Sequence, residues 1–83
     1  MPTVAIIDGV KILVYGNDHG LPHFHLLAAE YRAVIDIETM QVIRGRLPRA
    51  RLRKALAWAE PRRAELLKAW DSARAGQPVE RIP

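Results

Sequence analysis

The stretch His23–Ile37, with the sequence HFHLLAAEYRAVIDI, decides the fold because it contains two alternating strands around a tight turn. Successive side chains of a strand point to opposite faces of a sheet, so the register determines which residues are buried. If residues 29–30 form a two-residue turn, Phe24 lies opposite Ile35 on an apolar face. We expect helices to pack against this apolar face, whereas the two histidines of the stretch lie on the opposite face.

The opposite face of this hairpin is predicted to carry most of the reactive side chains. The same register places His23 across from Asp36. It places His25 across from Val34, and Arg32 lies on this side as well. This face therefore combines imidazole, carboxylate and guanidinium groups.

The connection after the hairpin sets the position of the last strand. A three-residue connection at 38–40 places Ile43 beside Ile35 in the core. It also places Arg44 beside Val34 on the opposite face. A two-residue turn would instead bury an arginine against the core, and we reject that register because a one-residue slip inverts every side chain.

Two further features complete a small antiparallel sheet of about five short strands joined in hairpins. Runs of β-branched and apolar residues, Thr3–Ile7 and Val10–Tyr15, precede and follow a short turn sequence. That sequence is Asp8-Gly9, and Asp-Gly is typical of a type I′ hairpin turn. A last short strand is expected at Val42–Arg46.

The sequence pattern changes to a helical period after Pro48, which suits the first turn of a helix. Pro61 interrupts the pattern, so we expect a break or sharp kink near Glu60-Pro61 and two helices packed on one face of the sheet. Gly76 ends the second helix and leaves a frayed tail. The apolar stripe of the helices consists of Leu52, Leu56, Ala59, Leu66, Trp70 and Ala73.

These elements predict a single α+β domain. With 83 residues, the chain has room for one hydrophobic core. The domain, residues 1–83, divides into a β-meander at 1–46, helices at 48–60 and 61–75, and a tail at 76–83.

The composition excludes several classes of function. The chain has no cysteine, which rules out disulfide frameworks, thiolate zinc fingers and cysteine nucleophiles. No apolar run reaches the length of a transmembrane helix, and the N-terminus lacks the pattern of a signal peptide. We therefore expect a cytoplasmic protein that has no association with a membrane.

The net charge of +4 is unevenly distributed along the chain. Residues 1–43 contain two cations and five anions, which gives −3, whereas residues 44–63 contain eight cations and one anion, which gives +7. Such a basic segment predicts a polyanionic partner, either nucleic acid or an acidic protein, although a solvated helix face has the same composition. The predicted binding residues are Arg44, Arg46, Arg49, Arg51, Arg53 and Lys54.

The three histidines, His19, His23 and His25, give the sharpest chemical signal. Two histidines on one strand face and a third from a loop match a common arrangement of ligands for Zn²⁺ or Fe²⁺. Asp36 could complete such a site or fix the tautomer of His23. The same groups suit general acid–base catalysis by His23, His25 and Asp36, with Arg44 or Arg32 stabilising the charge of a phosphodiester. Ordinary hydrogen bonding of the histidines at the sheet edge is the alternative.

Residues 17–25 (NDHGLPHFH), residues 34–39 (VIDIET) and the helix from Trp58 to Trp70 resemble a small prokaryotic family, the domain of unknown function DUF4160. The resemblance covers nearly the whole chain. It implies a tiny cytoplasmic protein, often encoded beside a second small gene in an arrangement that looks like a toxin–antitoxin pair. The resemblance brings no established activity with it.

Two positions depart from the family pattern. Met40 stands at a turn position where the family usually has glycine, which predicts backbone strain in that turn. Pro61 stands where the family more often continues without proline, so the expected helix break is particular to this chain.

Two hypotheses of function follow from these features. In the first, the protein is a regulator or toxin–antitoxin-like component whose basic segment binds nucleic acid or a small cognate partner protein. In the second, it is a toxin-like ribonuclease or metal-dependent hydrolase that uses His19, His23 and His25, with zinc as the candidate cofactor. The first is favoured because the sequence supplies no independently placed nucleophile or second acid. A polar-faced sheet of this size could also form a homodimer, which would cover an edge strand.

Overall fold

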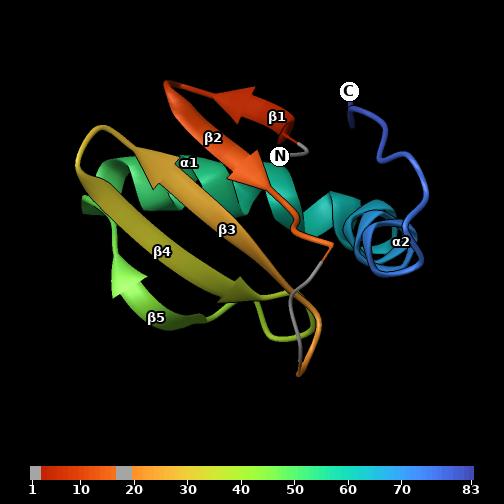
Figure 1. Ribbon diagram of the computed structural model, residues 1–83. Helices are drawn as coiled ribbons and strands as arrows, with labels where there is room; N and C mark the ends of the chain where they lie inside the picture. The colour runs from red at the N-terminus through yellow and green to blue at the C-terminus, as the bar shows by residue number, and fades with distance from the viewer. Residues whose placement is uncertain (1–2, 17–19) are drawn as a thin grey trace.

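The computed structural model describes residues 3–16 and 20–83, and it confirms an α+β fold built on one antiparallel sheet (Figure 1). The sheet has the strand order β1-β2-β3-β4-β5, so each strand pairs with its neighbour in the chain. The strands are β1 (Thr3–Ile7), β2 (Val10–Leu13), β3 (His23–Ala28), β4 (Tyr31–Asp36) and β5 (Val42–Arg46). The helical elements are α1 (Arg49–Ala59), the 3₁₀ turn η1 (Glu60–Arg62) and α2 (Arg63–Arg74).

The β3–β4 hairpin has the predicted register along its whole length. Phe24 pairs with Ile35, and both side chains are fully buried. At the open end of the hairpin His23 pairs with Asp36. Ala29 adopts a φ of +51°, so the two-residue turn uses left-handed backbone. The alternation of the sequence and the length of the turn together fix the two faces of the sheet.

Left-handed backbone also occurs in the other turns. Asp8 and Gly9 have φ values of +51° and +79°, which is the combination that a type I′ turn requires. Met40 has a φ of +61°, which confirms that a non-glycine residue occupies a left-handed position in the β4–β5 turn. Gly45 in β5 has a φ of +74°, and a Cβ there would fall on the carbonyl oxygen of Arg32. Only glycine lets the two strands approach this closely.

The pairing of β4 with β5 differs from the prediction at one position. Val34 pairs with Arg44 as expected. Ile35, however, pairs with Val42, so Ile43 is an extra residue in a β-bulge. Ile43 is 49% exposed, and the prediction that it packs in the core is wrong.

The β4–β5 turn is the reason for this difference. The Asp36 N–H donates to the Gln41 carbonyl at 3.0 Å, and the Met40 N–H donates to the Asp36 carbonyl at 2.7 Å. Asp36 therefore has Gln41 as its partner across the turn. A three-residue connection at 38–40 would have paired Gln41 with Ile37 instead. The extra residue Ile43 restores the outward register of Arg44.

The helical segment runs from Arg49 to Arg74 with no loop inside it, so the prediction of two separate helices is wrong. α1 continues through η1 into α2, and Figure 1 shows that the axis turns there. Pro61 is tolerated because the start of a 3₁₀ turn needs no N–H from it. The Arg62 guanidinium donates to the Trp58 carbonyl at 2.7 Å beside the bend. Within the described residues, no helix is long and apolar enough to cross a membrane.

The hydrophobic core lies between one face of the sheet, which we call the inner face, and the helical segment. Phe24, Leu26 and Ile35 of the inner face belong to the same buried cluster as Ala55 of α1 and Leu66 of α2. The predicted helical stripe is confirmed, since its members are buried or partly buried in this cluster. The sheet face on the other side is called the outer face below.

α2 lies across the ends of the central strands. At its start, Arg63 Nε donates to the carbonyl of Ile37, just beyond β4, at 2.9 Å. Near its end, the Ala73 carbonyl lies so close to Gly16 that a Cβ on Gly16 would stand 2.7 Å from the oxygen. Side chains of α2 therefore reach the rim of the outer face as well as the core.

The C-terminal segment packs against the sheet, so the prediction of a frayed tail is wrong. The Ile82 N–H donates to the Val4 carbonyl of β1 at 2.8 Å, and the Ile82 side chain is buried. Arg62 Nε donates to the Pro83 carbonyl at 2.8 Å. This segment has no periodic pattern, and burial of one isoleucine side chain stabilises its position.

Candidate nucleic-acid interface

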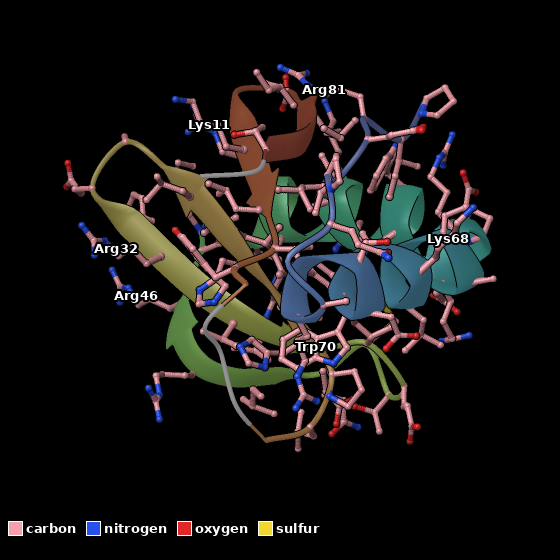
Figure 2. The ribbon with its side chains drawn as sticks, turned by 45° about the vertical axis from the view of Figure 1, so that its right-hand side comes forward. Lys11, Arg32, Arg46, Lys68, Trp70 and Arg81 are labelled. Carbon is pink, nitrogen blue, oxygen red and sulfur yellow. The ribbon has the colours of Figure 1, made fainter. Side chains whose placement is uncertain are left out.

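A row of cations crosses the outer face from strand to strand. The pairing places Ile6, Lys11, Leu27, Arg32 and Arg46 in line across the five strands. Lys11, Arg32 and Arg46 are exposed, and we call these three residues the cationic row. Figure 2 shows Arg32 and Arg46 side by side, pointing away from the sheet.

The next row of the outer face combines a histidine with a fourth cation. It consists of Leu13, His25, Val34 and Arg44 in consecutive strands. The acidic residues of this half of the chain lie elsewhere, at strand ends and in turns. In the described part these acids are Asp8, Glu30, Asp36 and Glu38. The net charge of −3 for residues 1–43 therefore misrepresents the outer face, which is basic between its ends.

The cations of the outer face repel one another. Arg32 and Arg46 are direct cross-strand partners, and like charges in such positions destabilise a sheet. Within residues 3–16 and 20–83, neither residue forms an ion pair, nor do Lys11 and Arg44. The Arg46 guanidinium lies 5.6 Å from the centroid of the Tyr31 ring, which provides some compensation. The protein therefore keeps cations here at a cost in stability.

Four rings that contact one another in a chain lie beside these cations, and we call them the ring cluster. Tyr15 and His25 meet edge to face, with centroids 4.4 Å apart. The centroids of His23 and His25 are 5.2 Å apart. His23 also contacts Trp70 of α2, with centroids 4.7 Å apart. The imidazoles predicted to share a face do so, and α2 supplies the indole that supports them.

A specific hydrogen bond fixes the tautomer of His23. Its Nδ1 lies 2.8 Å from the Leu21 carbonyl oxygen. Because a carbonyl can only accept, Nδ1 carries the proton, and Nε2 has the lone pair in the neutral imidazole. The packing of His23 against the buried Trp70 orients the ring further.

Both histidines line an open pocket of about 400 Å³ on the outer face, which we call the outer pocket. Its remaining wall is mostly apolar, with one guanidinium. Its lining consists of Gly20, Leu21, His23, His25, Val34, Ile43 and Arg44. Leu21 and Ile43 are 48% and 49% exposed, so the rim of the pocket presents aliphatic side chains to solvent.

A second, larger concavity of about 570 Å³ lies between α2 and the C-terminal segment. Its charged lining is mixed, with Glu65 and Glu80 against Lys68 and Arg81. It contains no histidine, and we do not assign chemistry to it.

Asp36 has a role in the β4–β5 turn. Its Oδ1 accepts hydrogen bonds from the N–H groups of Glu38 at 2.8 Å and Thr39 at 3.4 Å. This arrangement is typical of an aspartate that begins a turn. Asp36 pairs with His23 in the sheet, and its participation in catalysis stays a prediction.

The predicted metal site involves a residue outside the described part of the chain, His19. Among the residues that the structure describes, no group of three histidine, cysteine, aspartate or glutamate side chains could hold a metal ion. His23 and His25 are adjacent, as two ligands of one ion would have to be. Zinc binding by His19, His23 and His25 stays a prediction.

The structure does not bring the six predicted basic residues onto one face. Arg44 and Arg46 lie on the outer face, whereas the residues of α1 lie on the other side of the sheet. The α1 residues Arg49, Arg51, Arg53 and Lys54 are all exposed. Lys54 Nζ lies 3.5 Å from Asp8 Oδ2 in an exposed ion pair.

Lys11 and Trp70 were missed as residues of this face. Lys11 could have been found by extending the alternation of β3 across to β2. Trp70 has the spacing of a core residue and is indeed buried, so the sequence offers no signal for its contact with His23.

The fold and the outer face define a class: a five-stranded meander backed by a bent helical segment, with a basic, histidine-bearing face. The sequence profile of the domain of unknown function DUF4160 matches residues 9–71, and the chain belongs to this family. The matched region runs from before β2 into α2, so it includes the cationic row, the ring cluster and the outer pocket. No curated protein and no solved structure gives a significant match.

Proposed function

We propose that the protein binds nucleic acid through the outer face of its sheet. The observation that supports this most is the set of four exposed cations on one face, none of them in an ion pair within the described residues. Phosphate groups would satisfy these cations and remove the repulsion between Arg32 and Arg46. Arginine is well suited to this role because its guanidinium forms two parallel bonds to a phosphate.

Binding of nucleic acid would suit two biological roles. A small nucleic-acid-binding protein in the cytoplasm would act as a regulator, or as one component of a toxin–antitoxin-like pair with a small cognate protein. An acidic cognate protein would use the same cations, and the experiment below separates the two ligands.

The test is the salt dependence of binding to a fluorescent single-stranded RNA, followed by anisotropy. Arg32→Ala/Arg46→Ala should weaken binding and make the negative slope of log affinity against log salt shallower by about 0.7 for each phosphate that the variant no longer neutralises. Lys68→Ala is the control, because it removes one exposed cation from α2, far from the cationic row (Figure 2).

An unchanged salt slope in the double variant would contradict the proposal. Binding to polyglutamate that disappears in the same variant, without binding to nucleic acid, would assign the face to an acidic protein instead. Arg49→Ala/Arg51→Ala/Arg53→Ala, measured in parallel, tests the contribution predicted for α1.

Cleavage of a phosphodiester is a second candidate function. It is favoured by the placement of His23, His25 and Arg44 around one pocket. His23 Nε2 would accept a proton, and Arg44 would stabilise the developing charge. Both His23→Ala and His25→Ala should abolish cleavage of a fluorogenic RNA while salt-dependent binding through the cationic row persists, and wild-type rates in both would exclude this function. Elemental analysis of untagged protein, with and without His23→Ala, tests whether zinc takes part.

A further inference from the structure

We propose that the outer pocket holds one unstacked base of a single-stranded nucleic acid, while Arg44 and the cationic row hold the adjacent phosphates. This inference rests on the proposed function and names the substrate class within it. According to this inference, the outer pocket accepts any base, and it binds single strands in preference to duplexes.

The lining of the outer pocket has the chemistry of a base site. Single-stranded RNA and DNA are recognised by rings and aliphatic side chains that pack on unstacked bases. The imidazoles of His23 and His25 and the side chains of Val34 and Ile43 form such a surface. The volume of about 400 Å³ lies within the range of about 300–1,000 Å³ typical of small-molecule sites.

Arg44 connects the pocket to the cationic row. It lines the pocket, and it lies on the same face of β5 as Arg46, two residues further along the strand. Two residues of a strand span about 7 Å, so a strand of nucleic acid could place a base in the pocket and its next phosphate at the row. Arg44 places a positive charge at this edge of the pocket. This charge favours a base with an attached phosphate and disfavours a neutral ligand.

The β-bulge gives independent support. It turns Ile43 out of the core, where a regular register would bury it, and leaves the side chain half-exposed at the pocket rim. Leu21 is exposed to the same degree on the same rim. A half-exposed isoleucine and leucine facing one pocket would be covered by the faces of a base.

The two imidazoles are held in position before any ligand arrives. His25 packs against the Tyr15 ring, and His23 donates to the Leu21 carbonyl and packs against Trp70. Side chains that are already ordered lose less entropy on binding, which favours affinity. A base within a duplex remains stacked and paired, so only a single strand can use this site.

The first experiment compares two isoleucines of equal exposure on the outer face. Ile43→Ser should weaken binding of single-stranded RNA about fivefold and leave binding of a duplex of the same sequence unchanged. Ile6→Ser is the matched control, because Ile6 is 50% exposed but lies on β1, away from the pocket. Equal effects of the two variants, or equal loss for duplex and single strand, would overturn the inference.

The second experiment uses adenosine monophosphate and ribose 5-phosphate as probes, followed by NMR of the side chains. Adenosine monophosphate should shift the imidazole signals of His23 and His25 and the methyl signals of Val34 and Ile43. Ribose 5-phosphate, which lacks the base, should shift only signals near Arg44. Identical shifts, or no methyl shifts, would overturn the base site, as would binding of the free nucleotide as tightly as the strand.

The two proposals fail in different ways. If salt-dependent binding depends on Arg32 and Arg46 but Ile43→Ser has no effect, the face binds nucleic acid and the base site is wrong. If Arg32 and Arg46 are dispensable as well, the proposed function itself is wrong.

Discussion

The inner and outer faces of the sheet come from the same five strands and are built on opposite principles. Phe24, Leu26 and Ile35 of the inner face are fully buried in one apolar cluster. The outer face places Arg32 against Arg46, a pair that opposes folding. The inner face therefore stabilises the protein, whereas the outer face has a composition that stability alone does not explain. Substitutions on the two faces should differ accordingly.

The largest effect is expected on the inner face. Phe24→Ala removes a fully buried ring and should lower the free energy of unfolding by about 3–5 kcal/mol, measured by urea denaturation. His25→Ala, the next residue on the outer side of the same strand, should cost clearly less because His25 is only partly buried. A similar loss in both variants would break the distinction between the faces.

An intermediate effect is expected where the edge strand meets the sheet. Gly45→Ala should lower the free energy of unfolding by about 1–3 kcal/mol or more, because it combines a left-handed backbone with a collision against the Arg32 carbonyl. Gly76→Ala has a similar φ of +73° but meets no atom within 4 Å, so it measures the backbone term alone. If the two variants lose the same stability, the close approach of β5 to β4 is not what Gly45 provides.

The smallest effect is expected for the cationic row. Arg32→Gln should leave the free energy of unfolding unchanged or raise it by up to about 1 kcal/mol, since it removes repulsion from Arg46. Affinity for nucleic acid should fall in the same variant. Lys68→Gln, with no such neighbour across a strand, should change neither quantity. A destabilised Arg32→Gln protein would show that the outer face contributes to folding.

The sequence was sufficient to predict the register that defines both faces. Alternation from His23 to Asp36 and a two-residue turn leave one arrangement that buries Phe24 with Ile35, and the structure has it. The face of His23 and His25 follows from that register. The outward position of Arg44 was predicted from a three-residue connection, whereas in the structure the bulge at Ile43 produces it.

The errors occurred where backbone geometry or packing in the folded protein overrides the sequence pattern. The bulge at Ile43 depends on the hydrogen bond between Asp36 and Gln41, which a count of loop residues does not specify. Pro61 was expected to separate two helices, but a 3₁₀ turn accommodates its missing N–H. Packing of Ile82 against β1 likewise depends on the finished sheet.

The site was predicted in part for the same reason. Charge counted along the chain assigned acidity to residues 1–43, yet the acids of the described part lie at strand ends and in turns while Lys11 and Arg32 point outward. The predicted basic segment included both Arg44 and Arg46 of β5 and four residues of α1, and the fold places α1 on the other side of the sheet from Arg46. Linear charge is therefore a poor guide to a surface that alternates every second residue.

The contact between Trp70 and His23 has a practical consequence for spectroscopy. The emission of an excited indole depends on the groups in contact with it, and the ring centroids of Trp70 and His23 lie 4.7 Å apart. The emission of Trp70 should therefore respond to a displacement of His23. Trp58, the second tryptophan, lies against Arg62 and contributes the rest of the tryptophan emission. Trp70 thus reports, without any label, on a histidine that lines the outer pocket.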